Sequence, residues 1–298
     1  MIRVASSIQS WNVSRKLGFI IHTVTTPNVL NTGSGRNTRK VVRLISYNIE
    51  YCEGVSHGIW EYLNAAHLLR SPQGLDKRMA SYLSDHHPDT LGFVEIDTGS
   101  IRAHSKDETA FFAEALGFEH VVKTNKYDSD DYWHRLLKNL PVFQYQDNAV
   151  LSRYDVETAT FHTLSKGVKN IAIEVEFSEP NPHTVILVHL ALFKGARMQQ
   201  LNELTYIVND ADTPVIVCGD FNTFNPDELN ILLESTRLHD AYSEADHAQK
   251  NTAPTWNPKH RLDNVLHTPR INLDRYRVLD ADFSDHLPVM LDYSIESK

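Results

Sequence analysis

The fold prediction starts from one stretch of the chain, Val215-Ile216-Val217-Cys218-Gly219-Asp220-Phe221-Asn222-Thr223. An apolar run of this length that closes on a glycine is typical of a buried strand. Side chains alternate along a strand, so Asp220 and Asn222 point to one side and Phe221 to the other. A carboxylate and a carboxamide at the end of a buried strand are costly unless they bind a partner. A metal ion or a phosphate would be such a partner, and a simple turn cap is the ordinary alternative.

Apolar runs recur along the chain and divide it into strands and helices. We expect strands at residues 41–47, 90–96, 119–124, 148–152, 156–164, 170–177, 184–190, 215–220, 262–267, 276–279 and 289–294. We expect helices at residues 76–85, 107–116, 196–209 and 226–234, a short helical patch at 60–69 and a surface loop at 127–146. Gly117 is placed to end the second helix, and Asn225 followed by Pro226 to begin the last one.

The strands from residue 148 to residue 190 follow one another without helices between them, which predicts antiparallel pairing. The helices fall into two groups. This pattern predicts an α+β fold in which two mainly antiparallel sheets pack face to face with helices outside each sheet. The polar strand ends would then gather along one edge of the sandwich.

Charge is distributed unevenly over the 298 residues, whose net charge is −9. All 38 acidic residues lie within residues 50–298, against 22 of the 29 basic ones, which gives that part a formal charge of −16. Such an acidic body disfavours nucleic acid as a partner and suits a site that collects divalent cations. Cys52 and Cys218 form neither a disulfide framework nor a zinc motif, which fits a reducing, cytoplasmic location.

Residues 1–40 form a basic, acid-free extension, and residues 41–298 are expected to form a single domain. The extension has three open interpretations: a disordered tail, a targeting segment, or an upstream extension of the reading frame. Its apolar run at residues 17–21 is too short to cross a membrane. Peripheral contact with lipid remains open, and so does the oligomeric state.

Further polar residues stand at the ends of other apolar runs. Each has an ordinary explanation alone, as a turn former, a solvated acid or a hydrogen-bonded histidine. Together they are the residue types of metal-assisted phosphoester chemistry. The oxygen ligands for Mg²⁺ would come from Asn48, Glu95 and Asp285, and His189 and His286 would move protons or stabilise charge. Asp263 lies within an apolar strand and needs a partner such as a histidine.

The ordered set of motifs resembles the endonuclease/exonuclease/phosphatase superfamily of DNase I-like, metal-dependent phosphodiesterases. The motifs that carry the resemblance are Ser46-Tyr47-Asn48-Ile49-Glu50, Val94-Glu95, Asn148-Ala149-Val150-Leu151-Ser152-Arg153, His189-Leu190, Gly219-Asp220-Phe221-Asn222, Arg261-Leu262-Asp263 and Ser284-Asp285-His286. The resemblance implies a four-layer α/β/β/α sandwich and a hydrolase that uses Mg²⁺ or Mn²⁺.

The resemblance also implies a role for each residue of the site. Asn48, Glu95 and Asp285 would hold the metal, with Glu50 near it. Asp220 would align the attacking water, and Asn222 and His189 would contact the scissile phosphate. His286, oriented by Asp263, would act as a base or a phosphate ligand.

The substrate is less well defined by the sequence. The His189, Arg197 and Gln200 spacing is similar to the sphingomyelinase and lipid-remodelling branch of the superfamily, which favours a lipid-like or small phosphodiester. Lys194 and Arg197 are the nearest candidates for phosphate contact. A nuclease acting on DNA or RNA is the alternative enzyme, and a catalytically inactive binding scaffold is the alternative from another class.

Overall fold

The structure is a computed structural model that describes residues 40–52, 54, 72–100, 103, 106–125, 146–167, 169–245 and 250–296. Three predicted features lie outside the described residues: the N-terminal extension except Lys40, the helical patch at 60–69, and the loop at 127–146 except its last residue.

The described strands form two sheets of six strands each. The first sheet has the order β11-β12-β1-β2-β4-β3, and its strands are β1 (Val42–Asn48), β2 (Thr90–Asp97), β3 (His120–Asn125), β4 (Gln146–Ser152), β11 (Ile271–Val278) and β12 (Val289–Ile295). The second has the order β5-β6-β7-β8-β10-β9, and its strands are β5 (Val156–Thr163), β6 (Ile171–Phe177), β7 (His183–His189), β8 (Val215–Asp220), β9 (His239–Asp240) and β10 (Asp263–His267).

Each sheet contains one parallel pair between antiparallel neighbours in the described chain: β1 with β2, and β7 with β8. Parallel strands end at the same edge of a sheet, so the polar ends of each pair lie together. The predicted antiparallel pairing is confirmed for β5, β6 and β7. β4 is also antiparallel to its neighbours, but these are β2 and β3 of the first sheet rather than β5, because the chain changes sheets between β4 and β5.

The helices are α2 (Leu75–Asp85), α3 (Glu108–Leu116), α5 (Lys194–Asp210), α6 (Asn230–Ser235) and α7 (Ala241–Glu244), with the 3₁₀ turns η1 (Glu50–Cys52) and η3 (Pro226–Leu229). The four helices predicted within the described residues are present with small shifts at their ends, whereas α7 and the turn η1 were not predicted. Gly117 ends α3 in the left-handed conformation. The helix predicted after Asn225 begins as η3, whose Asp227 amide donates to the Asn225 side chain. No helix of the described residues is long and apolar enough to cross a membrane.

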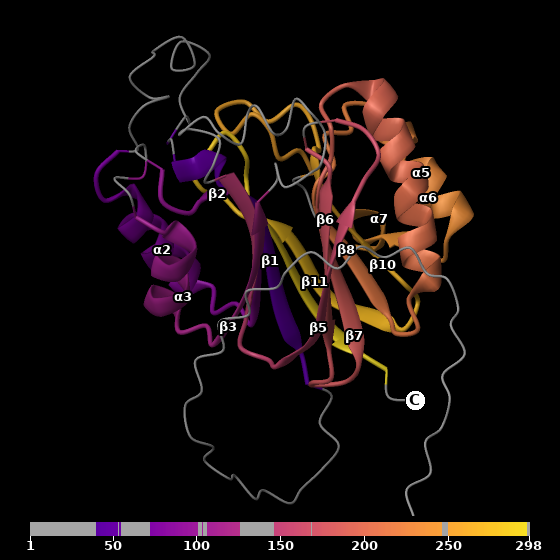
Figure 1. Ribbon diagram of the computed structural model, residues 1–298, viewed down its shortest axis with the longest axis horizontal. Coiled ribbons are helices and arrows are strands. Elements are labelled where there is room, and N and C mark those ends of the chain that lie inside the picture. The colour runs from indigo at the N-terminus through magenta and orange to yellow at the C-terminus, as the bar shows by residue number, and fades with distance from the viewer. Residues whose placement is uncertain are drawn as a thin grey trace, which may run out of the picture.

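Strand alternation produces the layers of the molecule. Ile216 and Cys218 face the apolar layer between the two sheets, whereas Val215 and Val217 face α5 and α6 on the outside of the second sheet. Side chains alternate in the same way along the strands of the first sheet, whose outer face packs against α2 and α3 (Figure 1). The predicted α/β/β/α sandwich is therefore confirmed. Cys218 is a fully buried member of the inner layer, as its place in the apolar run predicts.

Gly219 allows β7 and β8 to approach closely just before the polar end of β8. Its φ is 131°, and a Cβ added there would lie 2.0 Å from the carbonyl oxygen of Val188. Because that contact is to the backbone of the paired strand, no side-chain rotation relieves it.

His183 links the sheets at the start of β7. Its Nδ1 donates to the Asn181 carbonyl at 2.8 Å, and its Nε2 accepts from the Tyr293 hydroxyl of β12 at 3.0 Å. The neutral ring satisfies both contacts, and burial lowers the pKa of His183 to about 4.

Gly219→Ala is expected to destabilise the fold by about 3 kcal/mol or more, because the new methyl group forces β7 and β8 apart. The control is Gly195→Ala in α5, where nothing lies within 4 Å of the added Cβ. There we expect a stabilisation of about 0.5–1 kcal/mol, since alanine favours helix over glycine. Urea unfolding of both variants provides the measurement, and equal stabilities would contradict the close approach.

His183 is expected to make the folded state acid-sensitive. Its folded pKa lies below the unfolded value, so the unfolded chain binds the proton first, and the stability present above the unfolded pKa falls as pH decreases toward the folded pKa. We expect His183 to account for a loss of about 2 kcal/mol between pH of roughly 7.5 and 5. His183→Gln should lack this component in urea unfolding, and the exposed His239→Gln should retain it. An unchanged pH dependence in His183→Gln would contradict this account.

Candidate functional site

Strand register in the second sheet places three of the predicted residues side by side. His189 of β7 lies opposite Asp220 of β8, and Asp220 lies opposite Asp263 of β10. All three side chains are buried. Each residue ends or begins its strand, so the three polar groups meet at one edge of the sheet, as the sequence predicts.

The first sheet contributes the other half of the site. Asn48 ends β1, Glu95 lies near the end of β2, and Asp285 and His286 lie in the loop before β12. That loop is tied to β1, because the Ser284 hydroxyl donates to the Asn48 carbonyl at 2.8 Å. The site is therefore divided between two sheets that pack face to face.

Asp220 is held by donors from both sheets. Its Oδ2 accepts from Asn48 Nδ2 at 3.1 Å and from Asn222 Nδ2 at 3.2 Å, and its Oδ1 accepts from the Asn222 amide at 2.9 Å. Asn222 also donates to the Leu190 carbonyl at 2.9 Å. Burial raises the pKa of Asp220 to about 6, although the neighbouring His286 lowers it. The result is a fixed carboxylate whose affinity for a proton is unusually high.

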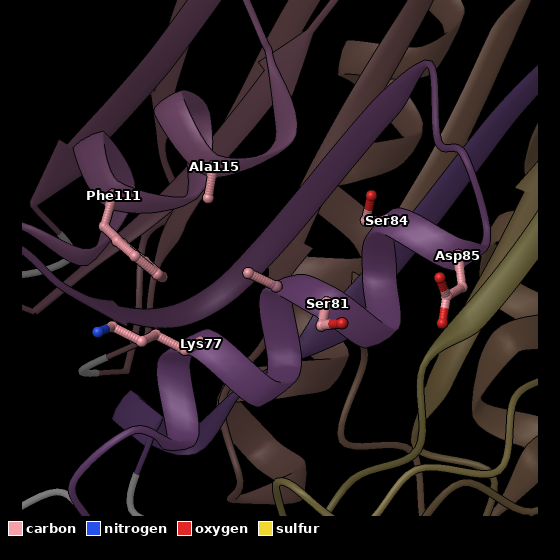
Figure 2. A pocket seen from close by; sticks show the side chains of 7 residues that line it. Lys77, Ser81, Ser84, Asp85, Phe111 and Ala115 are labelled. Atoms are coloured by element: carbon pink, nitrogen blue, oxygen red, sulfur yellow. The ribbon is translucent and has the colours of Figure 1, made fainter.

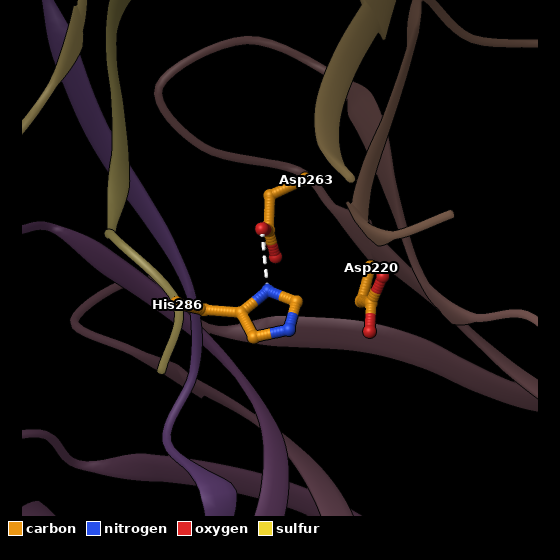
Figure 3. Close-up of side chains that lie close together, drawn as sticks. All are labelled: Asp220, Asp263 and His286. Carbon is orange, nitrogen blue, oxygen red and sulfur yellow. Dashed lines mark hydrogen bonds and ion pairs between the residues drawn. The ribbon is translucent and has the colours of Figure 1, made fainter. Parts of the chain in front are cut away.

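Asp263 and His286 form a hydrogen-bonded pair across the two sheets (Figure 3). His286 Nδ1 lies 2.7 Å from Asp263 Oδ2, which leaves Nε2 on the side of Asp220. Burial lowers the pKa of His286, but Asp263, Asp285 and Asp220 together raise it well above its usual value. The predicted contact between Asp263 and His286 is present in the structure.

His189 and Glu95 lie beside this pair. His189 Nε2 is 3.5 Å from both Glu95 Oε1 and Asp220 Oδ2, so it stands between the two carboxylates. Lys169, which the sequence analysis did not single out, places its Nζ 2.9 Å from Glu95 Oε1. A lysine in a hairpin loop just before an apolar strand has no distinguishing sequence pattern. The packing of the second sheet against the first brings it to the site.

Four oxygen-bearing side chains form the group predicted to bind a metal. The Glu50 amide donates to Asn48 Oδ1 at 3.1 Å, and the Asp285 amide lies 3.4 Å from Glu50 Oε2. With Glu95, they offer three carboxylates and one amide oxygen, which are the hard ligands that suit Mg²⁺ or Mn²⁺. The chemistry of this donor set fits such an ion, and the ammonium of Lys169 shows that Glu95 already accepts a positive charge.

A second group, Asp220, Asp263 and His286, also brings one ligand atom from each residue within 4.8 Å of the others and can hold a metal ion. The direct hydrogen bond between Asp263 and His286 favours a proton-sharing pair here, since a metal bound between them would have to break it. The oxygen group remains the site at which the sequence predicts the metal.

Three strand ends carry site residues in the left-handed backbone region. The φ angles are 45° at Glu50, 58° at Glu95 and 52° at Asn222. Each such residue costs on the order of 1–3 kcal/mol, and strain of this kind concentrates at functional sites. Tyr51 and Cys52 continue the left-handed turn after Glu50.

The two predicted phosphate-contact residues of α5 differ in position. Lys194 is exposed at the first position of the helix. Arg197 is buried, and its guanidinium binds Glu228 Oε2 at 2.7 Å and the carbonyls of Ala191 and Leu192 at 3.1 and 2.6 Å. The structure thus does not present Arg197 to a substrate; it fixes the turn that follows β7.

A pocket of about 430 Å³ opens between α2 and α3, outside the first sheet (Figure 2). Its lining residues are Lys77, Ala80, Ser81, Ser84, Asp85, Phe111 and Ala115. None of the candidate site residues lines it.

Comparison with known structures agrees with this fold. A structure of endonuclease/exonuclease/phosphatase from Beutenbergia cavernae DSM 12333 is 20% identical with a TM-score of 0.66, covering 87% of this chain and 72% of that one. A mannosyl-6-phosphatase from Bacteroides thetaiotaomicron VPI-5482 is 16% identical with a TM-score of 0.64, covering 85% and 100%. The human Nocturnin catalytic domain with bound sulfate is 19% identical with a TM-score of 0.60, covering 87% and 96%.

No curated protein matches the sequence. The profile of the Endonuclease/Exonuclease/phosphatase family matches residues 45–286, a span that contains all of the candidate site residues. This match confirms the predicted enzyme class, a hydrolase of phosphate esters. The chain belongs to the Endonuclease/Exonuclease/phosphatase family.

Proposed function

We propose that this protein is a divalent-metal-dependent hydrolase that cleaves a small or lipid-like phosphoester by in-line attack of water. The observation that carries the proposal is the contact network across the two sheets. Asn48 of the oxygen group donates to Asp220, and His286, which pairs with Asp263, has its Nε2 3.9 Å from Asp285 Oδ1, so a carboxylate and an imidazole both adjoin the oxygen group.

Asp220 acts on the water. Its carboxylate is fixed by Asn48 and by Asn222, so one oxygen can accept a hydrogen bond from a water molecule and aim it at phosphorus. A carboxylate whose pKa is raised to about 6 remains ionised at neutral pH and accepts a proton more readily than an ordinary aspartate.

His286 and His189 act on the phosphoryl oxygens. The ring of His286, whose Nδ1 is held by Asp263, donates from Nε2 and stabilises negative charge as it develops. His189 adds a second donor between Glu95 and Asp220. Asn48, Glu50, Glu95 and Asp285 would hold Mg²⁺ or Mn²⁺, which when bound supplies Lewis-acid neutralisation of the phosphate and its leaving group.

Surface features near the site favour a substrate with an apolar part. Leu192 and Phe193, which follow β7, are 54% and 81% exposed, and Phe224, which follows β8, is 46% exposed. The acidic charge of residues 50–298 disfavours duplex nucleic acid. Peripheral contact with lipid would place these apolar side chains against the acyl region.

The substrate class is tested by hydrolysis with Mg²⁺ and with EDTA. The substrates are bis-4-nitrophenyl phosphate, a sugar 6-phosphate, sphingomyelin, a phosphatidylinositol, and single- and double-stranded DNA. We expect cleavage of a small or lipid-like ester. Efficient DNA cleavage would make the protein a nuclease, and folded protein inactive on every substrate would favour a binding scaffold.

Asp220→Ala and His286→Ala are each expected to lower kcat/KM by about 10²-fold or more, because each removes a group that acts in the transition state. Circular dichroism establishes that the variants fold. The exposed His239→Ala on β9 should keep wild-type activity. Near-normal turnover in either site variant would refute these roles.

Removal of divalent metal with EDTA is expected to abolish turnover, and Mg²⁺ or Mn²⁺ should restore it. Glu95→Gln removes one carboxylate of the oxygen group and should raise the metal concentration needed for half-maximal activity by about tenfold or more. Full activity of EDTA-treated protein would contradict a metal-dependent mechanism.

A further inference from the structure

Lys169 reaches the site from the sheet opposite its partner. It lies in the loop between β5 and β6 of the second sheet, whereas Glu95 belongs to β2 of the first. The 2.9 Å contact between Lys169 Nζ and Glu95 Oε1 therefore crosses the sandwich and enters the oxygen group. None of the roles assigned above uses this ammonium.

The loop that carries Lys169 is closed at its base and held in place. The Leu164 amide donates to the Asn170 carbonyl at 2.7 Å, and Asn170 Nδ2 returns a hydrogen bond to the Leu164 carbonyl at 3.2 Å. Glu203 of α5 accepts from the Ser165 amide at 2.7 Å. These bonds fix both ends of the loop against the body of the protein.

Gln200 of α5 joins this loop to the turn after β7. It is fully buried; its Nε2 donates to the Lys169 carbonyl at 2.7 Å and to the Lys166 carbonyl, and its Oε1 accepts from the Ala191 amide at 2.7 Å. Gly167 lets the loop pack closely, because a Cβ there would lie 2.8 Å from Ala191 Cβ. The carbonyl of Lys169 is thus tied by a hydrogen bond to a buried side chain of α5.

Charge balance indicates what this lysine does. A divalent cation bound by Glu95 would repel an ammonium that contacts the same carboxylate, because the single negative charge of Glu95 cannot balance both of them. An anion placed between them removes the conflict. A phosphoryl group has several oxygens that share negative charge, so it can accept from the ammonium with one oxygen and face the metal with another.

We propose that Lys169 is a substrate-binding residue that holds Glu95 before a metal ion binds and then donates to a non-bridging oxygen of the phosphoryl group. This inference rests on the proposed function and adds a residue to that site. Lys169 should oppose metal binding alone and favour phosphate binding to the metal-loaded protein, two effects of opposite sign.

The test measures both effects in the full chain by isothermal titration calorimetry. Lys169→Met keeps the aliphatic stem and removes the charge, and Lys169→Arg keeps the charge. The matched control is Lys166→Met, because Lys166 is exposed on the same loop and meets Gln200 through its backbone. The ligands are Mn²⁺ alone, and inorganic phosphate added to Mn²⁺-loaded protein.

For Lys169→Met we expect Mn²⁺ to bind about tenfold more tightly, since a like charge is gone. Inorganic phosphate should bind about tenfold or more weakly, since a charge-assisted hydrogen bond is lost. Lys169→Arg should remain close to wild type, and Lys166→Met should be unchanged in both titrations. A merely structural role would not tighten metal binding.

Unchanged Mn²⁺ and phosphate affinities in Lys169→Met, with a wild type that binds metal and hydrolyses a phosphoester, would overturn this inference and leave the proposed function intact. Equal losses of phosphate binding in Lys169→Met and Lys166→Met would also overturn it, because they would indicate nonspecific electrostatic attraction by the loop rather than a direct contact with Lys169. A wild type that neither binds Mn²⁺ nor cleaves any ester would overturn the proposed function itself.

Discussion

The apolar layer between the two sheets is the contact on which the site depends, because each sheet carries only part of the chemistry. Asn48 and Glu95 stand on the first sheet, and His189, Asp220 and Asp263 on the second. The inner layer of buried aliphatic and aromatic side chains fixes the spacing between them. Hydrogen bonds of about 3 Å across this boundary tolerate little sliding of one sheet over the other.

The strand ends show what this arrangement costs. Glu50, Glu95 and Asn222 adopt backbone angles that ordinary residues avoid, and Asp220 is an acid buried beside Asp263. Such features lower stability in isolation, and the surrounding hydrogen bonds and the packed layers offset them. The site is thus held in a geometry that the local sequence would not adopt alone.

Much of this structure follows from the sequence, because strand alternation and helix signals are local. The β8 run, the Asn225 cap and the Gly117 end of α3 were all predictable, and so was the gathering of polar strand ends at one edge of the sandwich. The change of sheet between β4 and β5 was not predictable, since a hairpin and a crossover between sheets have the same local pattern. Lys169 and Arg197 show the same limit. Only tertiary contacts decide that Lys169 pairs with Glu95 in the site, whereas Arg197 pairs with Glu228 outside it.

The buried thiol of Cys218 offers a way to follow the inner layer in time. Burial raises the pKa of Cys218 to about 12, so the folded protein exposes almost no thiolate to a thiol reagent. Cys52 is likewise buried and protonated, but it belongs to the layer between the first sheet and its helices. The rate at which each cysteine is modified therefore reports how often its layer opens. Modification of Cys218 reports separation of the two sheets, and modification of Cys52 reports separation of the helices from the first sheet.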